Sequence, residues 1–461
     1  IWEKNAIFSY LVFHLGKKRH FFLLGFPSGK KRGFFHFQHE VIAMPTPTLL
    51  KQYHKNESKS RKLHHDLYNS VLSHHIDIPI RHLNACREFT AFYYYTEDIV
   101  QILSSIMFEL RKLASITGAL PPVAINSFER ACLIEEIQSS NDIEGVRSTR
   151  KEIKAAIDEQ DAVNAPNRPR LWSTVNKYLK LQQQEEIPFR SSRDLRSFYD
   201  EFLADEIERE NPKNLPDGAV FRKEPVEVWS KTKVIHRGVV PEEKIIRDMD
   251  LALGILQDKQ IPDLIRVSLF HYLFGYIHPF YDGNGRTSRF ITSYYLAKIL
   301  HPLVAIRLSI TIKRSLRVYY KLFEDTNHQG NYGDLTPFVT GFLWLIQKSI
   351  TRVNEILQER GKKLNTLAHH LEYNYFRSPK NKTDWKIYFV LLQAYFFSDD
   401  GATLEEIANT VGQSVKTVRT HIKSYPAERI AANKMRKAHR YKLSTAFIQE
   451  LEALASRHTM P

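Results

Sequence analysis

The chain has 461 residues, 43% hydrophobic and 25% charged, which is enough for two or three domains with a sizeable core. Its 66 Lys and Arg against 51 Asp and Glu give a formal charge of +15, which favours polyanionic partners such as nucleotides or nucleic acid. Two cysteines, Cys86 and Cys132, exclude a disulfide framework; we expect both in the core and a cytoplasmic location. No apolar run reaches the roughly 20 residues of a membrane helix, so no membrane partner is expected.

The first 43 residues differ in character from the rest. Residues 1–43 hold seven Lys or Arg against two Glu and follow neither a helical nor a strand period. The chain begins with Ile1, and Met44 opens an ordinary stretch. We therefore expect residues 1–43 to be a non-native or disordered leader, with natural translation beginning at Met44.

Residues 44–190 are predicted to form an N-terminal helical region. Residues 96–118 place apolar side chains at helical spacing and end on a glycine. After Leu-Pro-Pro, residues 127–145 predict a second helix, with Ser127 near its start and Gly145 at its end.

Residues 191–350 predict a second helical block. Within it, the alternating β-branched and aromatic residues at 226–240 predict a hairpin. Residues 263–280 predict a buried helix that ends at Pro279, and residues 289–300 the next helix. A further helix is predicted from Thr336 and Pro337 onward.

The C-terminal part is predicted to be a linker, residues 351–385, and a small domain, residues 386–461. Residues 403–422 have helix–turn–helix spacing around Gly412, and residues 439–444 are a candidate wing strand. Residues 414–442 hold nine Lys or Arg against one Glu, so this winged helix–turn–helix is a candidate DNA contact. Many such units only pack against neighbouring parts of a protein. An affinity for DNA that falls steeply with salt would indicate DNA binding, and a flat response would indicate a packing unit.

The loop "HPFYDGNGRTSR", residues 278–289, contains the candidate catalytic and ligand-binding residues. Gly283 and Gly285 let backbone N–H groups converge on an anion at a helix N-terminus, and Asn284 and Arg286 can hydrogen-bond phosphate oxygens. Asp282 is a hard oxygen ligand suited to Mg²⁺, and His278 is a candidate general base. The pattern predicts attack of a hydroxyl on a phosphate.

This string resembles the signature of the Fic family (filamentation induced by cAMP), His-Pro-Phe-x-Asp/Glu-Gly-Asn-Gly-Arg-x-x-Arg, at every specified position. The resemblance extends over about residues 120–345. It implies a mainly α fold: a Fic helical bundle with a small β-hairpin flap, preceded here by the helical region and followed by the winged helix–turn–helix.

The implied activity is protein adenylylation, in which AMP moves from ATP to a Tyr, Thr or Ser hydroxyl of a target protein. By resemblance, His278 takes the hydroxyl proton and Asp282 holds Mg²⁺ between the α- and β-phosphates. Arg286 grips the phosphate tail and Arg289 the γ-phosphate. The ATP-binding set is Gly283, Asn284, Gly285, Arg286 and Arg289. In the family, the hairpin is a flap that aligns the target segment as an added strand; the flap residues here are Val226, Val228, Val234 and Ile235.

The stretch "SSNDIEG", residues 139–145, resembles the family's inhibitory motif, Ser/Thr-x-x-x-Glu-Gly/Asn, met by Ser140, Glu144 and Gly145. Ser140 and Glu144 are four residues apart and share a helix face. The resemblance implies that Glu144 pairs with Arg289, occupies the γ-phosphate position and silences the enzyme.

Two alternatives stay open. One is a DNA-binding regulator that uses the Fic core as a nucleotide sensor, and the other is a Fic enzyme that removes AMP. A homodimer is a further open expectation. His pairs such as His64-His65 lack the spacing of metal ligands and are expected at the surface.

Overall fold

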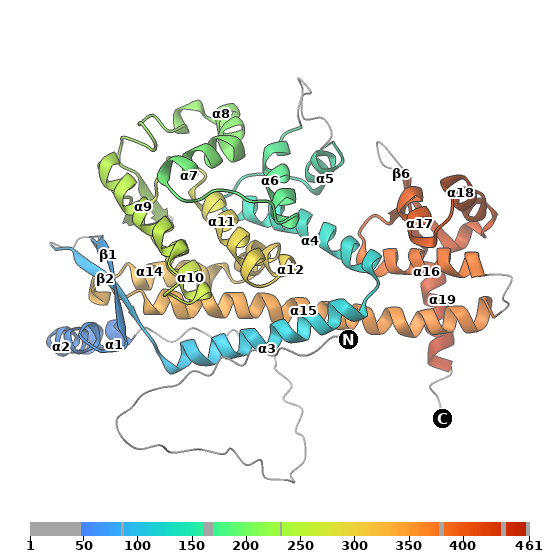
Figure 1. Ribbon diagram of the computed structural model, residues 1–461, viewed down its shortest axis with the longest axis horizontal. Coiled ribbons are helices and arrows are strands. Elements are labelled where there is room, and N and C mark those ends of the chain that lie inside the picture. Colours follow the sequence, from blue (N-terminus) through green and yellow to red (C-terminus); the bar gives the residue numbers. More distant parts are fainter. Residues whose placement is uncertain are drawn as a thin grey trace, which may run out of the picture. The chain divides into compact units, whose positions relative to one another are not determined.

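The structure is a computed structural model that describes residues 48–83, 87–159, 169–230, 233–377, 382–434 and 439–457. The chain divides into two units, Ile1–Ala43 and Met44–Pro461, and the described residues all belong to the second. This unit is mainly α-helical, as the sequence predicted, with short antiparallel strand pairs (Figure 1). The predicted leader and Cys86 lie outside the described residues, whereas Cys132 is buried as expected. None of the helices in the described ranges is both long and apolar enough to cross a membrane.

The N-terminal region, expected to be helical, also contains a β-hairpin. β1 (Ser73–Ile80) pairs with β2 (Phe89–Tyr94). The helical interpretation overlooked a period of two: Ile76, Ile78 and Ile80 are buried, and the less buried Asp77 and Pro79 stand between them. The expectation that His residues here lie on a plain surface is also incomplete, since His64 packs edge-on against aromatic rings. The flanking helices are α1 (Thr48–Lys55), α2 (Glu57–Tyr68) and α3 (Glu97–Ala119).

The helix that carries the candidate inhibitory motif is longer than predicted. α4 (Pro122–Ile143) begins at Pro122 rather than Ser127. A proline at the first turn lacks only an N–H that would have no partner there, and its φ already suits a helix, so the Leu-Pro-Pro segment starts the helix instead of preceding it. The predicted end is confirmed, because Gly145 follows the last turn with φ 73°.

The candidate site lies between two buried helices. α10 (Asp263–Ile277) and α11 (Asn284–Ile299) pack against each other and are apolar or buried on most sides. Beside them lies the predicted hairpin, β3 (Glu227–Ser230) with β4 (Lys233–Arg237). The other helices of this part are α5 (Arg150–Asp158), α6 (Trp172–Gln182), α7 (Ser192–Tyr199), the π-helix η1 (Asp200–Ala204), α8 (Asp205–Glu210), α9 (Glu242–Gln257), α12 (Pro302–Ala305), α13 (Leu308–Arg314) and α14 (Leu316–Thr326).

A single 40-residue helix, α15 (Thr336–Tyr375), connects this bundle to the C-terminal elements (Figure 1). Its predicted start is confirmed. Residues 351–375, predicted to begin a linker, continue the helix because Leu357, Leu364 and Leu371 recur every seven residues and are buried. The long α3 packs along the same helix. Most of the predicted linker therefore belongs to a packed helix.

The C-terminal elements have the predicted order of two helices and then strands. α17 (Leu404–Val411) ends at Gly412, whose φ is 70°, and Ser414 caps α18 (Val415–Ser424). The strands form one sheet in the order β5–β7–β6, and β7 is the predicted wing strand. The remaining elements are α16 (Lys382–Phe397), β5 (Ala402–Thr403), β6 (Ile430–Lys434), β7 (His439–Leu443) and α19 (Thr445–Arg457). The identification as a winged helix–turn–helix and the domain boundaries stay predictions.

Candidate active site

His278 sits at the point where the chain leaves α10. It caps the helix with φ 54° and ψ 61°, a left-handed conformation that is uncommon for a residue with a side chain. Its imidazole Nδ1 lies 3.3 Å from the carbonyl oxygen of Gly275. A carbonyl can only accept a hydrogen bond, so Nδ1 carries the proton and Nε2 keeps its lone pair. His278 therefore presents the acceptor nitrogen that a general base needs.

The backbone around His278 is held by a buried arginine. Arg222 is fully buried and donates to three carbonyl oxygens, those of His278 at 2.9 Å, Glu224 at 2.8 Å and Val239 at 2.9 Å. Burial lowers the pKa of the His278 imidazole to about 4, and the neighbouring His236 acts in the same direction. At neutral pH the imidazole is therefore uncharged and able to accept a proton.

The loop after His278 is closed by stacking and by one side-chain amide. Phe280 is fully buried and stacks on Tyr199, with ring centroids 3.8 Å apart and planes 9° from parallel. The Asn284 amide accepts from Phe280 N at 2.9 Å and donates to Phe280 O at 2.7 Å. The Asn284 side chain, predicted to hydrogen-bond phosphate, is thus committed to the loop, and only its backbone N–H remains for an anion.

The start of α11 is where the anion nest was predicted. Gly283 precedes the helix with φ 77°, and a Cβ there would lie 2.8 Å from Leu203 Cδ1, so both conformation and space require glycine. The first backbone N–H groups of a helix have no acceptor within the helix. Those of Asn284, Gly285 and Arg286 therefore stand at the positive end of the α11 dipole, where an anion binds.

Arg286 is buried with unsatisfied donors. Its Nη1 donates to Glu206 Oε1 at 2.6 Å, and the two side chains are 2% and 8% exposed. Among the residues that the structure describes, its Nε and Nη2 have no hydrogen-bond partner, and Nη2 lies 3.6 Å from Asp282 Oδ1. Buried donors without acceptors cost free energy. Their presence beside a helix N-terminus indicates a site built for an anionic ligand.

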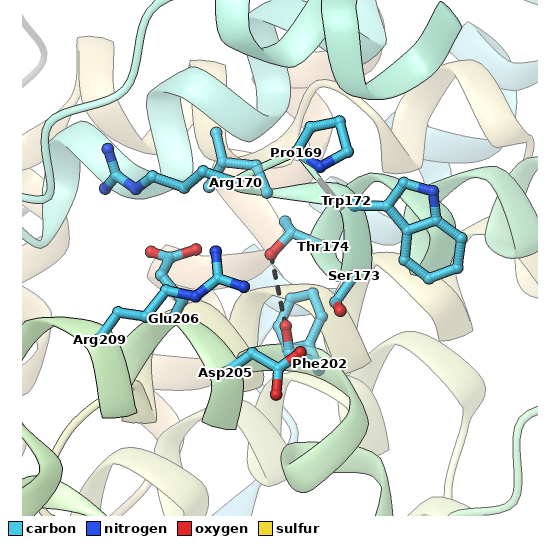
Figure 2. Close-up of a pocket in the computed structure, with 10 residues that line it drawn as sticks. Pro169, Arg170, Trp172, Ser173, Thr174, Phe202, Asp205, Glu206 and Arg209 are labelled. Carbon is cyan, nitrogen blue, oxygen red and sulfur yellow. Dashed lines mark hydrogen bonds between the residues drawn. The ribbon is translucent and has the colours of Figure 1, made fainter. Parts of the chain in front are cut away.

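Glu206 also lines a small pocket between the beginning of α6 and the η1–α8 segment. Figure 2 shows Arg170 and Thr174 on one side of this pocket and Asp205 and Glu206 on the other. Burial raises the pKa of Glu206, while the Arg286 charge opposes that change. The pocket residue Glu206 is therefore also the carboxylate that pairs with Arg286.

Arg289 contacts both residues predicted for inhibition. Its Nη1 donates to Glu144 Oε1 at 2.7 Å, its Nε to Ser140 Oγ at 3.1 Å, and its Nη2 to Ser140 O at 2.8 Å. A Cβ on Gly285 would lie 2.1 Å from Glu144 Oε1. The Glu144 carboxylate thus lies against the first turn of α11, at the anion nest itself.

Glu144 is presented by a specific helix ending. Gly145 N donates to Asp142 O at 3.2 Å and Val146 N to Asn141 O at 3.0 Å, the paired hydrogen bonds of a Schellman motif. Such an ending needs a left-handed residue after the cap, which explains Gly145. Lower on α4, the buried Glu136 accepts from Ser309 N at 2.9 Å and so fixes α4 on α13.

The predicted flap residues lie on or beside the hairpin. Val228 pairs with His236 and Trp229 with Val234, so Ile235 is the extra residue of a bulge. Val226 lies just before β3, where its carbonyl accepts from Gly238 N at 3.0 Å. The hairpin is anchored to α10 by His236, whose Nε2 lies 2.6 Å from Tyr276 O. Within the described residues the hairpin has no third strand, so it keeps unpaired strand edges.

Asp282 is the one predicted metal ligand. Its side chain is partly exposed and Oδ1 accepts from Gly283 N, which orients the carboxylate beside the nest. Among the described residues no group of three or more His, Cys, Asp or Glu is arranged to hold a metal. A single carboxylate next to phosphate-binding donors matches the way Mg²⁺ is bound together with a nucleotide.

Sequence reasoning missed three residues that build this site. Arg222 had only a weak signal, its position directly after the apolar and buried Val220 and Phe221. Tyr199 and Glu206 had none that we recognise. Glu206 stands among the other acidic residues of α8, and only the fold selects it for Arg286.

The comparison with family models matches residues 191–296 to the Fic/DOC family. A protein adenylyltransferase Fic of Nematostella vectensis is 39% identical over 72 residues, which are 16% of this chain and 15% of that protein. A protein of the same name from Drosophila yakuba is also 39% identical over 72 residues, or 13% of its length. The matched segment is thus a small part of these curated relatives.

Solved structures resemble this chain more loosely. A Fic family protein from Desulfovibrio desulfuricans G20 is 20% identical with a TM-score of 0.45, covering 77% of this chain and 98% of that one. A fragment of Fic-1 from C. elegans is 19% identical with a TM-score of 0.39, covering 57% of this chain and 73% of that one.

Proposed function

We propose that this chain, which carries a Fic-family domain over residues 191–296, is a protein adenylyltransferase that moves AMP from ATP to a Tyr, Thr or Ser hydroxyl of a target protein. One observation carries the proposal: two donors of the buried Arg286 have no hydrogen-bond acceptor among the described residues, in the first turn of the helix that follows the His278 loop. The names of the two curated relatives point to the same activity.

The chemistry follows from the positions of these groups. The target hydroxyl oxygen attacks the α-phosphorus of ATP, the bond from that phosphorus to the bridging oxygen breaks, and pyrophosphate leaves. His278 Nε2 takes the hydroxyl proton. The N–H groups of Asn284, Gly285 and Arg286 bind the α- and β-phosphates. The Gly283 N–H, predicted for the same task, donates to Asp282 Oδ1 instead. This reaction depends on positioning and charge neutralisation more than on covalent steps by the protein.

The two arginines bind different parts of the ATP phosphates. The unpaired Nε and Nη2 of Arg286 bind the phosphate tail, and Arg289 binds the γ-phosphate. Asp282 is the ligand that would hold Mg²⁺. That ion would neutralise charge on the phosphates and the leaving pyrophosphate.

The same geometry supports autoinhibition. Glu144 already occupies Arg289, with Ser140 bracing the guanidinium from the same helix, so the γ-phosphate has to displace a carboxylate that is in place. Bound ATP would then be turned away from productive attack. The protein at rest is therefore nearly silent.

The flap supplies the target contact. A free strand edge accepts a partner segment through main-chain hydrogen bonds, with little reading of its side chains. Val226, Val228, Val234 and Ile235 would line that segment, together with the exposed Trp229. The cytoplasmic location and the homodimer stay predictions.

Labelling tests the proposal. The chain is incubated with ATP labelled on the α-phosphate, Mg²⁺ and a lysate of the source organism. Label should appear on protein, more strongly with Glu144→Gly, and should vanish with His278→Ala. A protein that binds ATP but transfers no label in either form would be the nucleotide sensor instead. Loss of label from previously modified target, without new transfer, would identify an enzyme that removes AMP.

A second candidate function, DNA binding by the C-terminal elements, rests on one face of α18. Lys416, Arg419 and Lys423 recur at helical spacing on its exposed side, opposite the buried Val418 and Ile422. None of these three cations has an ion pair with any described residue. Arg419 and Lys423 border a hollow that also includes His439 of the wing strand. Phosphates of duplex DNA are the ligand that this arrangement suits.

A further inference from the structure

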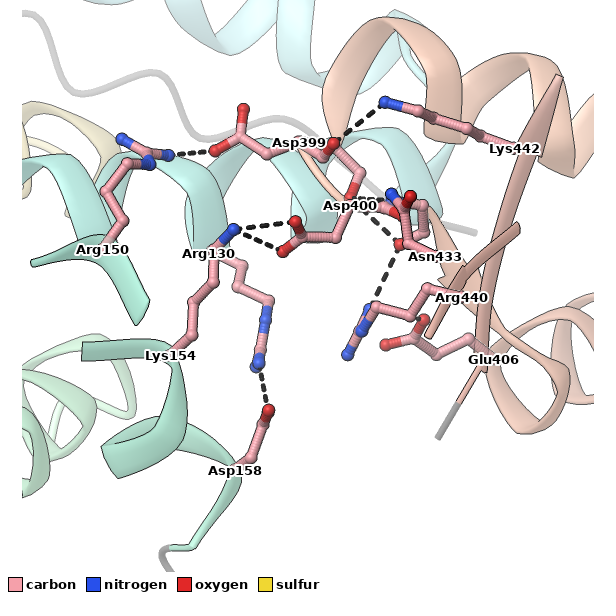
Figure 3. Close-up of polar contacts among 12 residues, drawn as sticks. Arg130, Arg150, Lys154, Asp158, Asp399, Asp400, Glu406, Asn433, Arg440 and Lys442 are labelled. Atoms are coloured by element: carbon pink, nitrogen blue, oxygen red, sulfur yellow. Dashed lines mark hydrogen bonds and ion pairs between the residues drawn. The ribbon is translucent and has the colours of Figure 1, made fainter. Parts of the chain in front are cut away.

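The turn between α16 and β5 joins the C-terminal elements to the region that carries Glu144. This turn contains Asp399 and Asp400, and both carboxylates reach α5 (Figure 3). Asp399 forms an ion pair with Arg150. Lys154 Nζ lies 2.7 Å from both carboxylate oxygens of Asp400. Arg150 and Lys154 are one helical turn apart, so two adjacent acids bind one face of α5.

The two pairs differ in environment. The Arg150 and Asp399 side chains are 39% and 46% exposed, which makes their pair weak in water. Lys154 and Asp400 are 14% and 23% exposed, so water screens their attraction less. The Lys154–Asp400 pair is therefore the stronger of the two.

The acidic turn is itself held in shape by the wing strands. Lys442 Nζ donates to Asp399 O at 2.9 Å, Asn433 Nδ2 to Asp400 O at 3.0 Å, and Arg440 Nη1 to Gly401 O at 3.1 Å (Figure 3). Gly401 has φ 106°, and a Cβ there would lie 2.6 Å from a backbone oxygen of β7. The turn therefore follows the position of β6 and β7.

α5 is the first element after Glu144, and little chain separates them. Thr149 caps α5 in a capping box with Glu152, so the helix start is well defined a few residues beyond Glu144. At its other end, Asp158 of α5 pairs with Arg130 of α4 at 2.5 Å. A shift of α5 is therefore passed to the short segment that follows Glu144 and, through Arg130, to the first half of α4.

We propose that Asp399 and Asp400 act as positioning residues for inhibition: by clamping α5, they make the C-terminal elements hold Glu144 on Arg289. This inference rests on the proposed autoinhibition. When the clamp opens, Glu144 leaves Arg289 more often and productive ATP binding rises. The C-terminal elements are thereby a regulatory input to the active site, whatever ligand they bind.

The test uses the full-length chain and initial rates of label transfer. Lys154→Ala and Asp400→Ala should each raise the rate by roughly three- to tenfold, a fraction of the rise from Glu144→Gly, because the clamp biases the inhibitory contact without removing it. The charge-swapped double variant, Lys154→Asp with Asp400→Lys, should return the rate toward that of the parent. Lys151→Ala, an exposed cation on the same helix, is the matched control and should change nothing.

A second arm separates positioning from a general loss of structure. In the Glu144→Gly background, Lys154→Ala should leave the rate unchanged, since no inhibitory carboxylate remains to be held. An equal rise in that background, or no rise in the parent while Glu144→Gly is fast, would overturn the clamp. A Glu144→Gly variant no faster than the parent would instead overturn the autoinhibition. Thermal unfolding of each variant identifies any that is misfolded. If a single variant is misfolded, the transfer rate of the charge-swapped double variant decides whether the clamp exists.

Discussion

Glu144 and Arg289 form an ion pair across 145 residues of sequence, with Oε1 and Nη1 2.7 Å apart. Burial by itself would lower the pKa of the Arg289 guanidinium, yet the Glu144 carboxylate and nearby groups raise that pKa above its usual value. Arg289 is therefore charged and already paired before any nucleotide arrives.

Removing this carboxylate should activate the protein. We expect Glu144→Gly to raise the initial rate of AMP transfer by roughly one to three orders of magnitude, since each tenfold step corresponds to about 1.4 kcal/mol of bias. Asp142→Ala, an exposed acid on the same helix that pairs with Lys313, is the control and should stay near the parent rate. Arg289→Ala should not activate, because the γ-phosphate contact goes with it. An unchanged rate in Glu144→Gly would make Glu144 an ordinary surface carboxylate.

His278 should be indispensable for transfer but not for binding. His278→Ala removes the acceptor nitrogen, so the rate in the Glu144→Gly background should fall by roughly 10²–10⁴-fold. ATP affinity, measured by calorimetry, should stay within a few-fold because the nest and both arginines remain. A variant that no longer binds ATP would assign His278 a structural role in the loop.

The pH profile should reflect the lowered pKa of His278. Its imidazole is protonated only below about pH 4, so the base is available well below the ordinary histidine range. The rate at low ATP concentration should therefore be nearly flat from about pH 5.5 to pH 7.5 and fall only below that window. Initial rates in Glu144→Gly across this range test the point. An acidic limb centred near pH 6.5 would mean that His278 is not desolvated in the working enzyme.

Glu206 should support both the fold and the nucleotide site. Glu206→Ala leaves the buried Arg286 without its partner, which should lower the free energy of unfolding by about 3 kcal/mol. Added Mg·ATP should recover part of that loss, because phosphate replaces the missing counter-charge. Denaturant unfolding with and without nucleotide measures both effects. Glu208→Ala, an exposed neighbour on α8, is the control; equal losses in the two variants would contradict the role given to Glu206.

If the C-terminal elements bind DNA, the α18 cations should carry the salt dependence. Replacing Lys416, Arg419 and Lys423 together by Ala should weaken binding to duplex DNA and reduce the slope of log K against log salt by about 3. Fluorescence anisotropy with a labelled duplex at several salt concentrations measures the slope. A matched triple variant of exposed lysines on α1 and α2, Lys51, Lys59 and Lys62, should keep the parent slope. A flat salt response in the parent would leave this part as a packing module.

Much of the local structure could be read from the sequence, because it depends on short-range chemistry. The buried helix before the loop followed from nearly continuous apolar residues, and the end of α4 from Gly145. The position of the predicted anion nest also followed locally, since Gly283 determines where α11 begins and so where its first N–H groups lie. Two local predictions were wrong: the period of two in β1 was overlooked within a region interpreted as helical, and the proline that starts α4 looked like a break.

The partners of the buried charges were decided only by the tertiary structure. Nothing near Glu206 in the sequence distinguishes it from the other acids of α8, yet only Glu206 meets Arg286. The fold also decides the partners of other polar groups: the partly exposed Asp399 and Asp400 meet α5, and the Asn284 amide bonds to Phe280 instead of phosphate. Burial makes an unpaired charge or amide costly, so each such group takes the partner that packing brings within reach, and packing joins residues that the sequence holds far apart.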